Sequence, residues 1–227
     1  MKRFGLAVQN ALVEQALSDA GLIAAAALIF RNQEELNSVD LNGLELDCLF
    51  FPHWSYIVPP SVYESLECVC FHAAPLPYGR GGSPIQNMIR LGHEKTEICA
   101  LRMTGEVDAG AVYMRKDFSL SGSGKEVFTR LYKDIAAMIL EMASQNYTPV
   151  EQVGEITVFK RLTAKDNRLP ERVTPRALYD HIRMTDICLY PSAWLEHGEW
   201  TLEFSDPVLS GNEVSAKVVF KRRPNNE

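Results

Sequence analysis

The sequence predicts an α/β protein in which helices flank a mostly parallel sheet and a small β-rich subdomain follows. Two short apolar runs, LDCLFF at 46–51 and ECVCF at 67–71, are typical of strands that are covered on both faces. The segment PPSVYESL between them opens with proline, as many helices do, so the order is strand, helix, strand. After residue 200 the polarity alternates as in an antiparallel hairpin. These patterns predict a Rossmann-like core.

The composition excludes several classes of protein. The chain has 227 residues, of which 46% are hydrophobic and 23% charged, so it can bury a sizeable core. Its net charge of -6 argues against a general nucleic-acid binder. No window approaches the roughly 18 apolar residues of a membrane span, and no secretion signal is recognisable. We therefore expect a soluble cytoplasmic protein with no membrane partner, and a homodimer is one open alternative for its assembly.

The first elements follow from local signals. Residues 4–8 predict a strand, and Asn10 can cap a helix that Gly21 ends. The apolar run LIAAAALIF at 22–30 suits a strand or a buried helix, because periodicity does not separate the two. The abrupt stop at Arg31 favours a strand.

The middle of the chain places polar side chains beside strand ends. His72 follows the apolar run ECVCF, and ligands gather at the carboxyl ends of strands in such folds. SPIQNMIRL predicts a helix capped by Ser83, and strands at 97–103 and 112–118 flank a glycine-bearing loop. That loop carries Asp108, which we expect at the same rim as His72.

The run SGSGKEVF at 121–128 has two interpretations. It resembles a phosphate-binding loop, but that motif needs glycine where Ser119 stands and serine or threonine where Glu126 stands. Ser123 and Glu126 instead form the pattern of a capping box. The sequence thus predicts a long buried helix here.

The sequence pattern changes near residue 150 and becomes mixed or β-rich. This change predicts a boundary between a core at 1–150 and a subdomain at 151–227. EITVFKR at 155–161 predicts a strand, Thr174 caps a helix, and the hairpin follows.

The cysteines predict reduced, mostly buried thiols. Their number is odd and no CxxC pair occurs, so we predict no metal site. The five are Cys48, Cys68, Cys70, Cys99 and Cys188.

A longer run carries a family resemblance. FPHWSYIVPPSVYESLECVCFHAAPLPYGRGGSPIQNMIRLG, followed by TEICALRMTGEVDAGAVYM, resembles the formyltransferases that use N10-formyltetrahydrofolate. In that family a strand leads to Asn-x-His, then to a Leu-Pro-x-x-Arg-Gly loop and a proline, and a later strand leads to an Asp-x-Gly loop. The resemblance covers about residues 45–115, with a weaker continuation at 168–194. Its members act on methionyl-tRNA, glycinamide ribonucleotide or amino sugars on nucleotide carriers.

The resemblance implies catalytic roles for His72 and Asp108. The third catalytic position, asparagine in the family, is Cys70 here, and a thiol is a weaker donor than an amide. We expect backbone N–H groups of Gly81 or Gly82 to replace the lost donor. A histidine after a strand is more often structural than catalytic, and only the order of the surrounding motifs raises His72 above that alternative.

The resemblance also implies the binding residues. The formyl donor, N10-formyltetrahydrofolate, is expected to place its pterin against Tyr56, Ile57, Val58, Asp108, Ala109 and Gly110. The acceptor or its phosphates are expected against Arg80, Gly81, Gly82 and Ser83.

Chemistry and resemblance together predict an N-formyltransferase. An imidazole titrates at about pH 6.5, so His72 can accept the proton of an attacking amine near neutral pH. Asp108 can orient the imidazole ring. The first hypothesis for the acceptor is a nucleotide-linked amino sugar, including the pseudaminic-acid type. One alternative is a methionyl-tRNA formyltransferase, for which a longer basic carboxy-terminal domain is expected. The other is a catalytically silent relative that binds folate or a sugar nucleotide, which Cys70 favours.

Overall fold

The structure is a computed structural model that describes residues 1–41 and 43–223. Its contacts divide the chain into two compact units that are interleaved in sequence. The first unit comprises Met1–Gly81, Glu97–Phe118 and Thr129–Val158, and the second comprises Gly82–Thr96, Ser119–Phe128 and Phe159–Glu227. The sequence predicts one boundary near residue 150, and that boundary stays a prediction.

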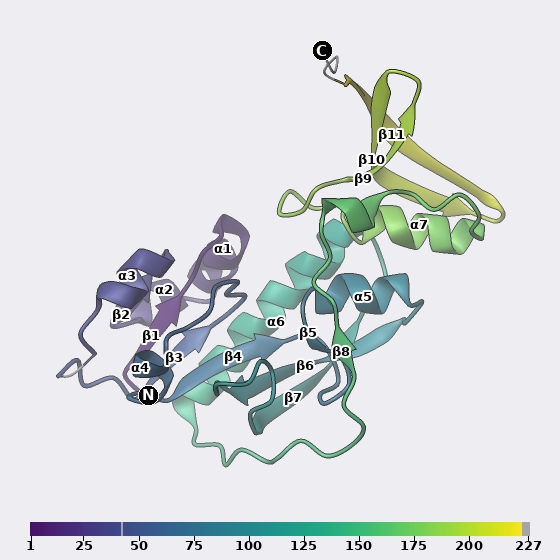
Figure 1. The fold of residues 1–227 in the computed structure, drawn as a ribbon. Helices are drawn as coiled ribbons and strands as arrows, with labels where there is room; N and C mark the ends of the chain where they lie inside the picture. The colour runs from purple at the N-terminus through teal and green to yellow at the C-terminus, as the bar shows by residue number, and fades with distance from the viewer. Residues whose placement is uncertain (42, 224–227) are drawn as a thin grey trace. The chain divides into compact units, whose positions relative to one another are not determined.

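The first unit is built on a mostly parallel six-stranded sheet, as the sequence predicts (Figure 1). Its strand order is β2-β1-β3-β4-β6-β7. β1 pairs in parallel with β2 and β3, and β3 pairs in parallel with β4, whereas β4 and β6 are antiparallel. The strands are β1 Phe4–Ala7, β2 Leu28–Phe30, β3 Cys48–Phe51, β4 Cys68–His72, β6 Lys95–Arg102 and β7 Val112–Ser119.

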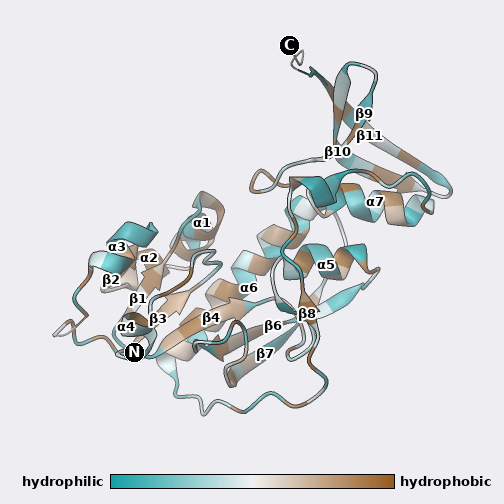
Figure 2. Ribbon diagram, viewed as in Figure 1, coloured by the Kyte–Doolittle hydropathy of each residue, from teal (hydrophilic) through white to brown (hydrophobic). Residues whose placement is uncertain are grey.

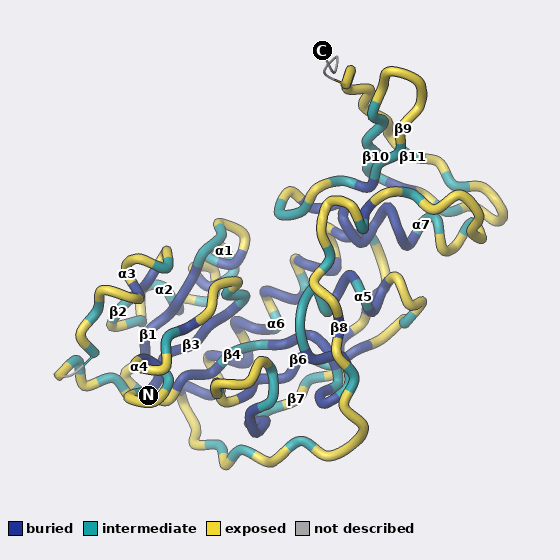
Figure 3. Tube along the Cα trace, viewed as in Figure 1, coloured by how far each residue is buried: buried dark blue, intermediate teal, exposed yellow. Residues whose placement is uncertain are grey.

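The central strands hold the core of this unit. Every residue of β1 and β3 is buried, because both faces of these strands are covered. Phe4 and Phe50 meet edge to face, with ring centroids 5.8 Å apart. Figures 2 and 3 show the consequence, since the same strands are coloured both hydrophobic and buried.

The amino-terminal helices confirm one prediction and correct another. α1 (Ala11–Asp19) begins as predicted, with the Asn10 side chain accepting a hydrogen bond from the Val13 N–H. The run at 22–30, predicted as one strand, is wrong in its first half: α2 takes Leu22–Ala25 and β2 begins only at Leu28. Alanine is the strongest helix former, so Ala24 and Ala25 continue the helix that starts at Leu22, and the chain becomes extended at Ala26. Two further short helices are α3 Gln33–Ser38 and α4 Pro60–Tyr63.

The long helix α6, Gly124–Ser144, confirms the capping box. The Glu126 N–H donates to the Ser123 hydroxyl, and the Ser123 N–H donates to the Glu126 carboxylate at 2.8 Å. The apolar positions on the predicted face are buried, namely Val127, Leu131, Ile135 and Ile139. The residues that suggest a phosphate loop therefore start a helix instead.

The segment 76–83 is largely irregular and contains only a two-residue strand. β5, Arg80–Gly81, pairs with β8, Val158–Phe159, in a two-stranded sheet, so the strand predicted at 155–161 is reduced to two residues. Ser83 precedes α5, Pro84–Arg90, but its side chain does not cap that helix. Ser83 has a φ of 52°, and its hydroxyl accepts a hydrogen bond from the Leu162 N–H, so the predicted cap is wrong.

The second unit ends in a three-stranded antiparallel sheet of order β11-β10-β9. Helix α7, Pro175–Arg183, begins as predicted with Thr174 as its cap and packs against β10. Its other elements are η1 Ala164–Asn167, β9 Ala193–His197, β10 Trp200–Ser210 and β11 Glu213–Arg222. In the part of the chain that the structure describes, no helix is both long enough and apolar enough to cross a membrane.

Candidate active site

His72 is the last residue of β4, and one nitrogen of its ring binds a backbone carbonyl of the protein. Its Nε2 lies 2.7 Å from the carbonyl oxygen of Gly79. A carbonyl can only accept, so Nε2 must carry hydrogen for this bond to exist. Only 5% of His72 is exposed. The ring is therefore fixed in tautomer and in orientation.

Asp108 faces the other nitrogen of the same ring. Its Oδ2 lies 3.3 Å from His72 Nδ1 and accepts a hydrogen bond of 2.9 Å from the Gly81 N–H. The structure thus brings together the two residues that the sequence singles out. Their arrangement differs from the predicted common rim: β6 runs antiparallel to β4, so its last residue pairs with Val69, and the 103–111 loop reaches His72 from there.

The pair is arranged to hold one proton between its two members. Because Nε2 donates to Gly79, a neutral ring would turn a lone pair at Nδ1 toward the carboxylate of Asp108. A proton placed between Nδ1 and Oδ2 removes that repulsion and makes a charge-assisted hydrogen bond. This pair can therefore take up and release a proton at a fixed position.

Cys70 lies two residues before His72 on the same strand, so both side chains share one face of the sheet. Its Sγ lies 3.7 Å from the Leu101 carbonyl oxygen, to which the thiol donates. Burial raises the pKa of the Cys70 thiol, and the nearby charge of Asp108 raises it further. The thiol therefore stays protonated, which excludes it as a thiolate nucleophile at neutral pH.

The predicted backbone replacement for the family's asparagine is wrong. The Gly81 N–H donates to Asp108, as described above. The Gly82 N–H donates to the Phe159 carbonyl oxygen at 3.1 Å. Because each N–H group already has an acceptor inside the protein, neither points to an open site.

The thiols give a test of burial. Burial raises the pKa of Cys48 and Cys68 to about 12 and that of Cys99 to about 11. At pH 8 these groups and Cys70 are almost entirely protonated, whereas Cys188 is exposed. We expect Ellman's reagent to label one thiol per chain rapidly in the folded protein and five after unfolding in guanidinium. Rapid labelling of two or more thiols in the folded state would contradict this assignment.

Arg80 has a different set of contacts from the predicted acceptor contacts. Its Nε and Nη2 donate to Gln152 Oε1 at 3.1 Å and 2.9 Å, and its Nη1 lies 3.2 Å from Glu106 Oε1. Only 11% of the side chain is exposed. The guanidinium group of Arg80 thus binds two side chains of the protein itself and links Glu106 to Gln152, which are far apart in sequence.

Three residues of this site are missed by the sequence analysis: Gly79, Glu106 and Gln152. Gly79 acts through its carbonyl, which no side-chain pattern reveals. Gln152 lies 44 positions from the Asp108 carbonyl that it contacts, beyond a long helix. Glu106 had a weak signal, since it lies in the same glycine-bearing loop as Asp108.

Gly110 fixes the other end of that loop. A Cβ atom at Gly110 would lie 1.9 Å from the carbonyl oxygen of Arg102, so only glycine fits against the end of β6. Ala109 is half-buried, and its N–H donates to the Glu106 carbonyl oxygen. The loop is thus packed closely against its own strand.

The turn after β3 is anchored beside β1. The Gln9 side chain donates to the Ser55 hydroxyl at 2.7 Å and accepts from the Ser55 N–H at 3.0 Å. Beyond it, Tyr56 is 48% exposed and Ile57 is 76% exposed. Val58 instead is buried in the apolar cluster against which Cys70 packs.

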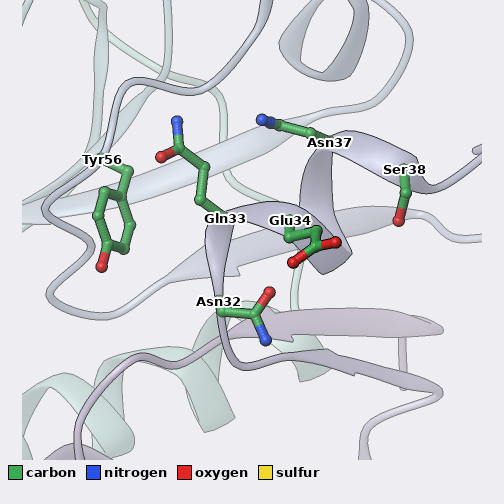
Figure 4. A pocket seen from close by; sticks show the side chains of 6 residues that line it. All are labelled: Asn32, Gln33, Glu34, Asn37, Ser38 and Tyr56. Carbon is green, nitrogen blue, oxygen red and sulfur yellow. The ribbon is translucent and has the colours of Figure 1, made fainter.

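Tyr56 also lines an open pocket of about 670 Å³. Figure 4 shows this pocket between the tyrosine ring and the side chains of α3, with Gln33 nearest the ring. Its remaining lining residues are Asn32, Glu34, Asn37 and Ser38. It shares one residue with the predicted pterin site and does not include His72 or Asp108.

Comparison with known proteins places this arrangement in a family. A solved structure described as methionyl-tRNA formyltransferase from Clostridium thermocellum is 31% identical in sequence, with a TM-score of 0.92 over 98% of this chain and 100% of that one. The chain belongs to the formyltransferase family. The family model described as "Methionyl-tRNA formyltransferase, C-terminal domain" matches residues 164–221.

Two further proteins are also similar to this chain. The methionyl-tRNA formyltransferase of Rhizobium rhizogenes is 27% identical over 86% of this chain and 63% of its own length. A 4-N formyltransferase from Francisella tularensis shares the fold, with 16% identity and a TM-score of 0.62 over 85% of this chain and 91% of that one. The chain spans 48% to 63% of the length of the first curated relatives that it matches.

Proposed function

We propose that this chain transfers a formyl group from N10-formyltetrahydrofolate to a primary amine. The observation that carries the proposal is the contact of His72 Nδ1 with Asp108 Oδ2 at 3.3 Å in a chain of the formyltransferase family. The donor supplies the activated formyl carbon. The protein must then remove one proton from the attacking amine and return one to the departing nitrogen.

The His72–Asp108 pair performs both proton transfers. As the amine nitrogen forms its bond to the formyl carbon, the pair takes the amine proton at the Nδ1 and Oδ2 side, because Gly79 occupies Nε2. The positive ring stabilises negative charge on the formyl oxygen, a task for which the Cys70 thiol is poorly suited. When the bond to N10 breaks, the pair delivers a proton to that nitrogen, so the proton count balances.

The donor is proposed to bind at the turn after β3 and at the Asp108 loop. The exposed faces of Tyr56 and Ile57 offer apolar area for a flat ring system, and Val58 supports the turn from the core. Asp108, Ala109 and Gly110 supply backbone groups for its polar edge. Gly81, Gly82 and Ser83 remain the proposed acceptor side, while Arg80 acts there through its contacts to Gln152 and Glu106.

For the acceptor we propose a nucleotide-linked amino sugar. Four lysine and arginine side chains lie in the described residues 193–223, three in the carboxy-terminal sheet and one directly after it. Each forms an ion pair with a carboxylate of this sheet or of its turns. The pairs are Lys217–Asp206, Lys221–Glu203, Arg222–Glu199 and Arg223–Glu196. A surface that binds tRNA needs cations available to neutralise phosphates, so this pairing favours a small acceptor.

Methionyl-tRNA is the second candidate, because the Clostridium thermocellum and Rhizobium rhizogenes relatives both bear that name. The family model that matches residues 164–221 is also described as the carboxy-terminal domain of methionyl-tRNA formyltransferase.

The acceptor classes can be separated by one panel. Purified protein is incubated with N10-formyltetrahydrofolate and, in separate reactions, with 4-amino sugar nucleotides and with charged initiator tRNA, and tetrahydrofolate release is followed. The proposal predicts turnover with a sugar nucleotide and none with tRNA. Turnover with tRNA alone would replace the proposed acceptor, and folate binding without turnover on any acceptor would favour the silent relative.

A further inference from the structure

We infer that Gln152 is a positioning residue that sets the Asp108 carboxylate against His72. The inference rests on the proposed function of that pair. Gln152 touches neither ring nor carboxylate; its Nε2 donates to the backbone carbonyls of Asp108 at 2.8 Å and Gly110 at 2.9 Å. These two bonds hold the loop on either side of Ala109.

The orientation of the Gln152 amide follows from its partners. Arg80 can only donate, so the atom that faces its Nε and Nη2 must be oxygen. The carbonyls of Asp108 and Gly110 can only accept, so the atom that faces them must be the NH₂ group. Glutamine is the one side chain of this length that offers a double donor and a double acceptor together. A glutamate could keep the bonds to Arg80 but would lose both bonds to the loop.

The loop is held from its beginning as well. Arg80 contacts Glu106 through Nη1 and Gln152 through Nε and Nη2, so one guanidinium bridges the start of the loop to the residue that holds its end. The Gly81 N–H, next along the chain, donates to the Asp108 carboxylate itself. Neighbouring residues of one strand thus fix both the loop and its carboxylate.

Gln152 stands in a fixed place because the chain before it is paired. Val150 exchanges two backbone hydrogen bonds with Val112, at 2.8 Å and 2.9 Å, in an isolated antiparallel bridge. Val112 follows Gly110 by two positions. The bridge therefore brings residue 152 alongside the loop that its side chain binds.

The loop needs such restraint. Asp108 has a φ of 53°, in the left-handed region that residues other than glycine seldom adopt. A conformation of this kind persists only where surrounding contacts determine it. Without the Gln152 bonds we expect the loop to relax and the carboxylate to leave Nδ1 of His72.

The test compares Gln152→Glu, Gln152→Met and the control Gln145→Glu, whose side chain is exposed at the end of α6. We expect both Gln152 variants to lower kcat for formyl transfer about 10-fold to 100-fold, as displaced catalytic groups do. The KM for the formyl donor should rise as well, because the same loop is proposed to bind the donor. Gln145→Glu should match the wild type. A kcat within twofold of the wild type in Gln152→Met would overturn the inference.

A second measurement does not depend on turnover. The ¹⁵N chemical shifts of the His72 ring report which nitrogen shares a proton with a carboxylate. We expect Nδ1 to shift in Gln152→Met while Nε2 keeps its bond to Gly79. If the wild type turns over no acceptor, the proposed function fails and this measurement decides the inference. Unchanged shifts at both nitrogens would overturn it.

Discussion

Replacing Asp108 by asparagine should lower kcat for formyl transfer about 10³-fold, in the range by which general acid–base groups accelerate reactions. The asparagine keeps the size of the side chain and removes the negative charge that faces His72 Nδ1 at 3.3 Å. The pair then cannot hold the amine proton between its two members. The measurement is steady-state tetrahydrofolate release at saturating donor and acceptor.

The matched control for this prediction is Asp117→Asn, which removes an exposed carboxylate on β7. It should leave kcat within twofold of the wild type, so a loss in Asp108→Asn reports position and not net charge. A kcat above one tenth of the wild-type value in Asp108→Asn would show that the carboxylate takes no part in moving the proton.

The largest expected loss of stability is at Arg183, whose side chain is 1% exposed. Its Nε donates to Asp180 Oδ1 at 2.6 Å, and its Nη1 donates to the carbonyls of Leu120 and Gly122. Arg183→Met should leave the buried Asp180 carboxylate, the buried Leu120 carbonyl and the part-buried Gly122 carbonyl without this donor. We expect the free energy of unfolding to fall by about 3–5 kcal/mol, measured by urea denaturation.

Two further variants separate the effect of losing Arg183 from the effect of the Asp180 charge. Arg176 donates to the other oxygen of Asp180 from a half-exposed position, so Arg176→Met should cost about 1 kcal/mol or less. The double variant Asp180→Leu/Arg183→Met should be more stable than Arg183→Met, because it also removes the buried carboxylate, whose Oδ1 would have lost its donor. A loss below 1 kcal/mol in Arg183→Met would show that this buried cluster contributes little to the fold.

Much of the fold could be predicted because its signals are local. Short apolar runs determine β3 and β4, and side-chain caps at Asn10, Ser123 and Thr174 start helices where the sequence expects them. The failures at Ser83 and at the run 22–30 have a common cause. In both places the residues are compatible with two local structures. A competing contact selects the structure at Ser83, and helix propensity selects it in the run 22–30.

The candidate site was predictable only in part. His72 and Asp108 could be identified because motif order and chemistry agreed on them, and the structure places them in contact. The hydrogen-bond partners of the site could not be predicted, because they depend on the antiparallel pairing of β4 with β6 and on the Val112–Val150 bridge. The engagement of Arg80 by Gln152 illustrates this, since an arginine in a glycine-rich loop suggests a ligand contact from sequence alone.

The role of His72 is tested in a single-turnover reaction, in which the accepted amine is added to the preformed complex of the enzyme with N10-formyltetrahydrofolate. His72→Asn is compared with the wild type and with the exposed control His197→Asn. We expect rapid formyl transfer by the wild type and the control, and a rate at least about 10²-fold lower in His72→Asn. Equal rates in all three proteins would contradict the proton-transfer role of His72 and, with it, the proposed mechanism.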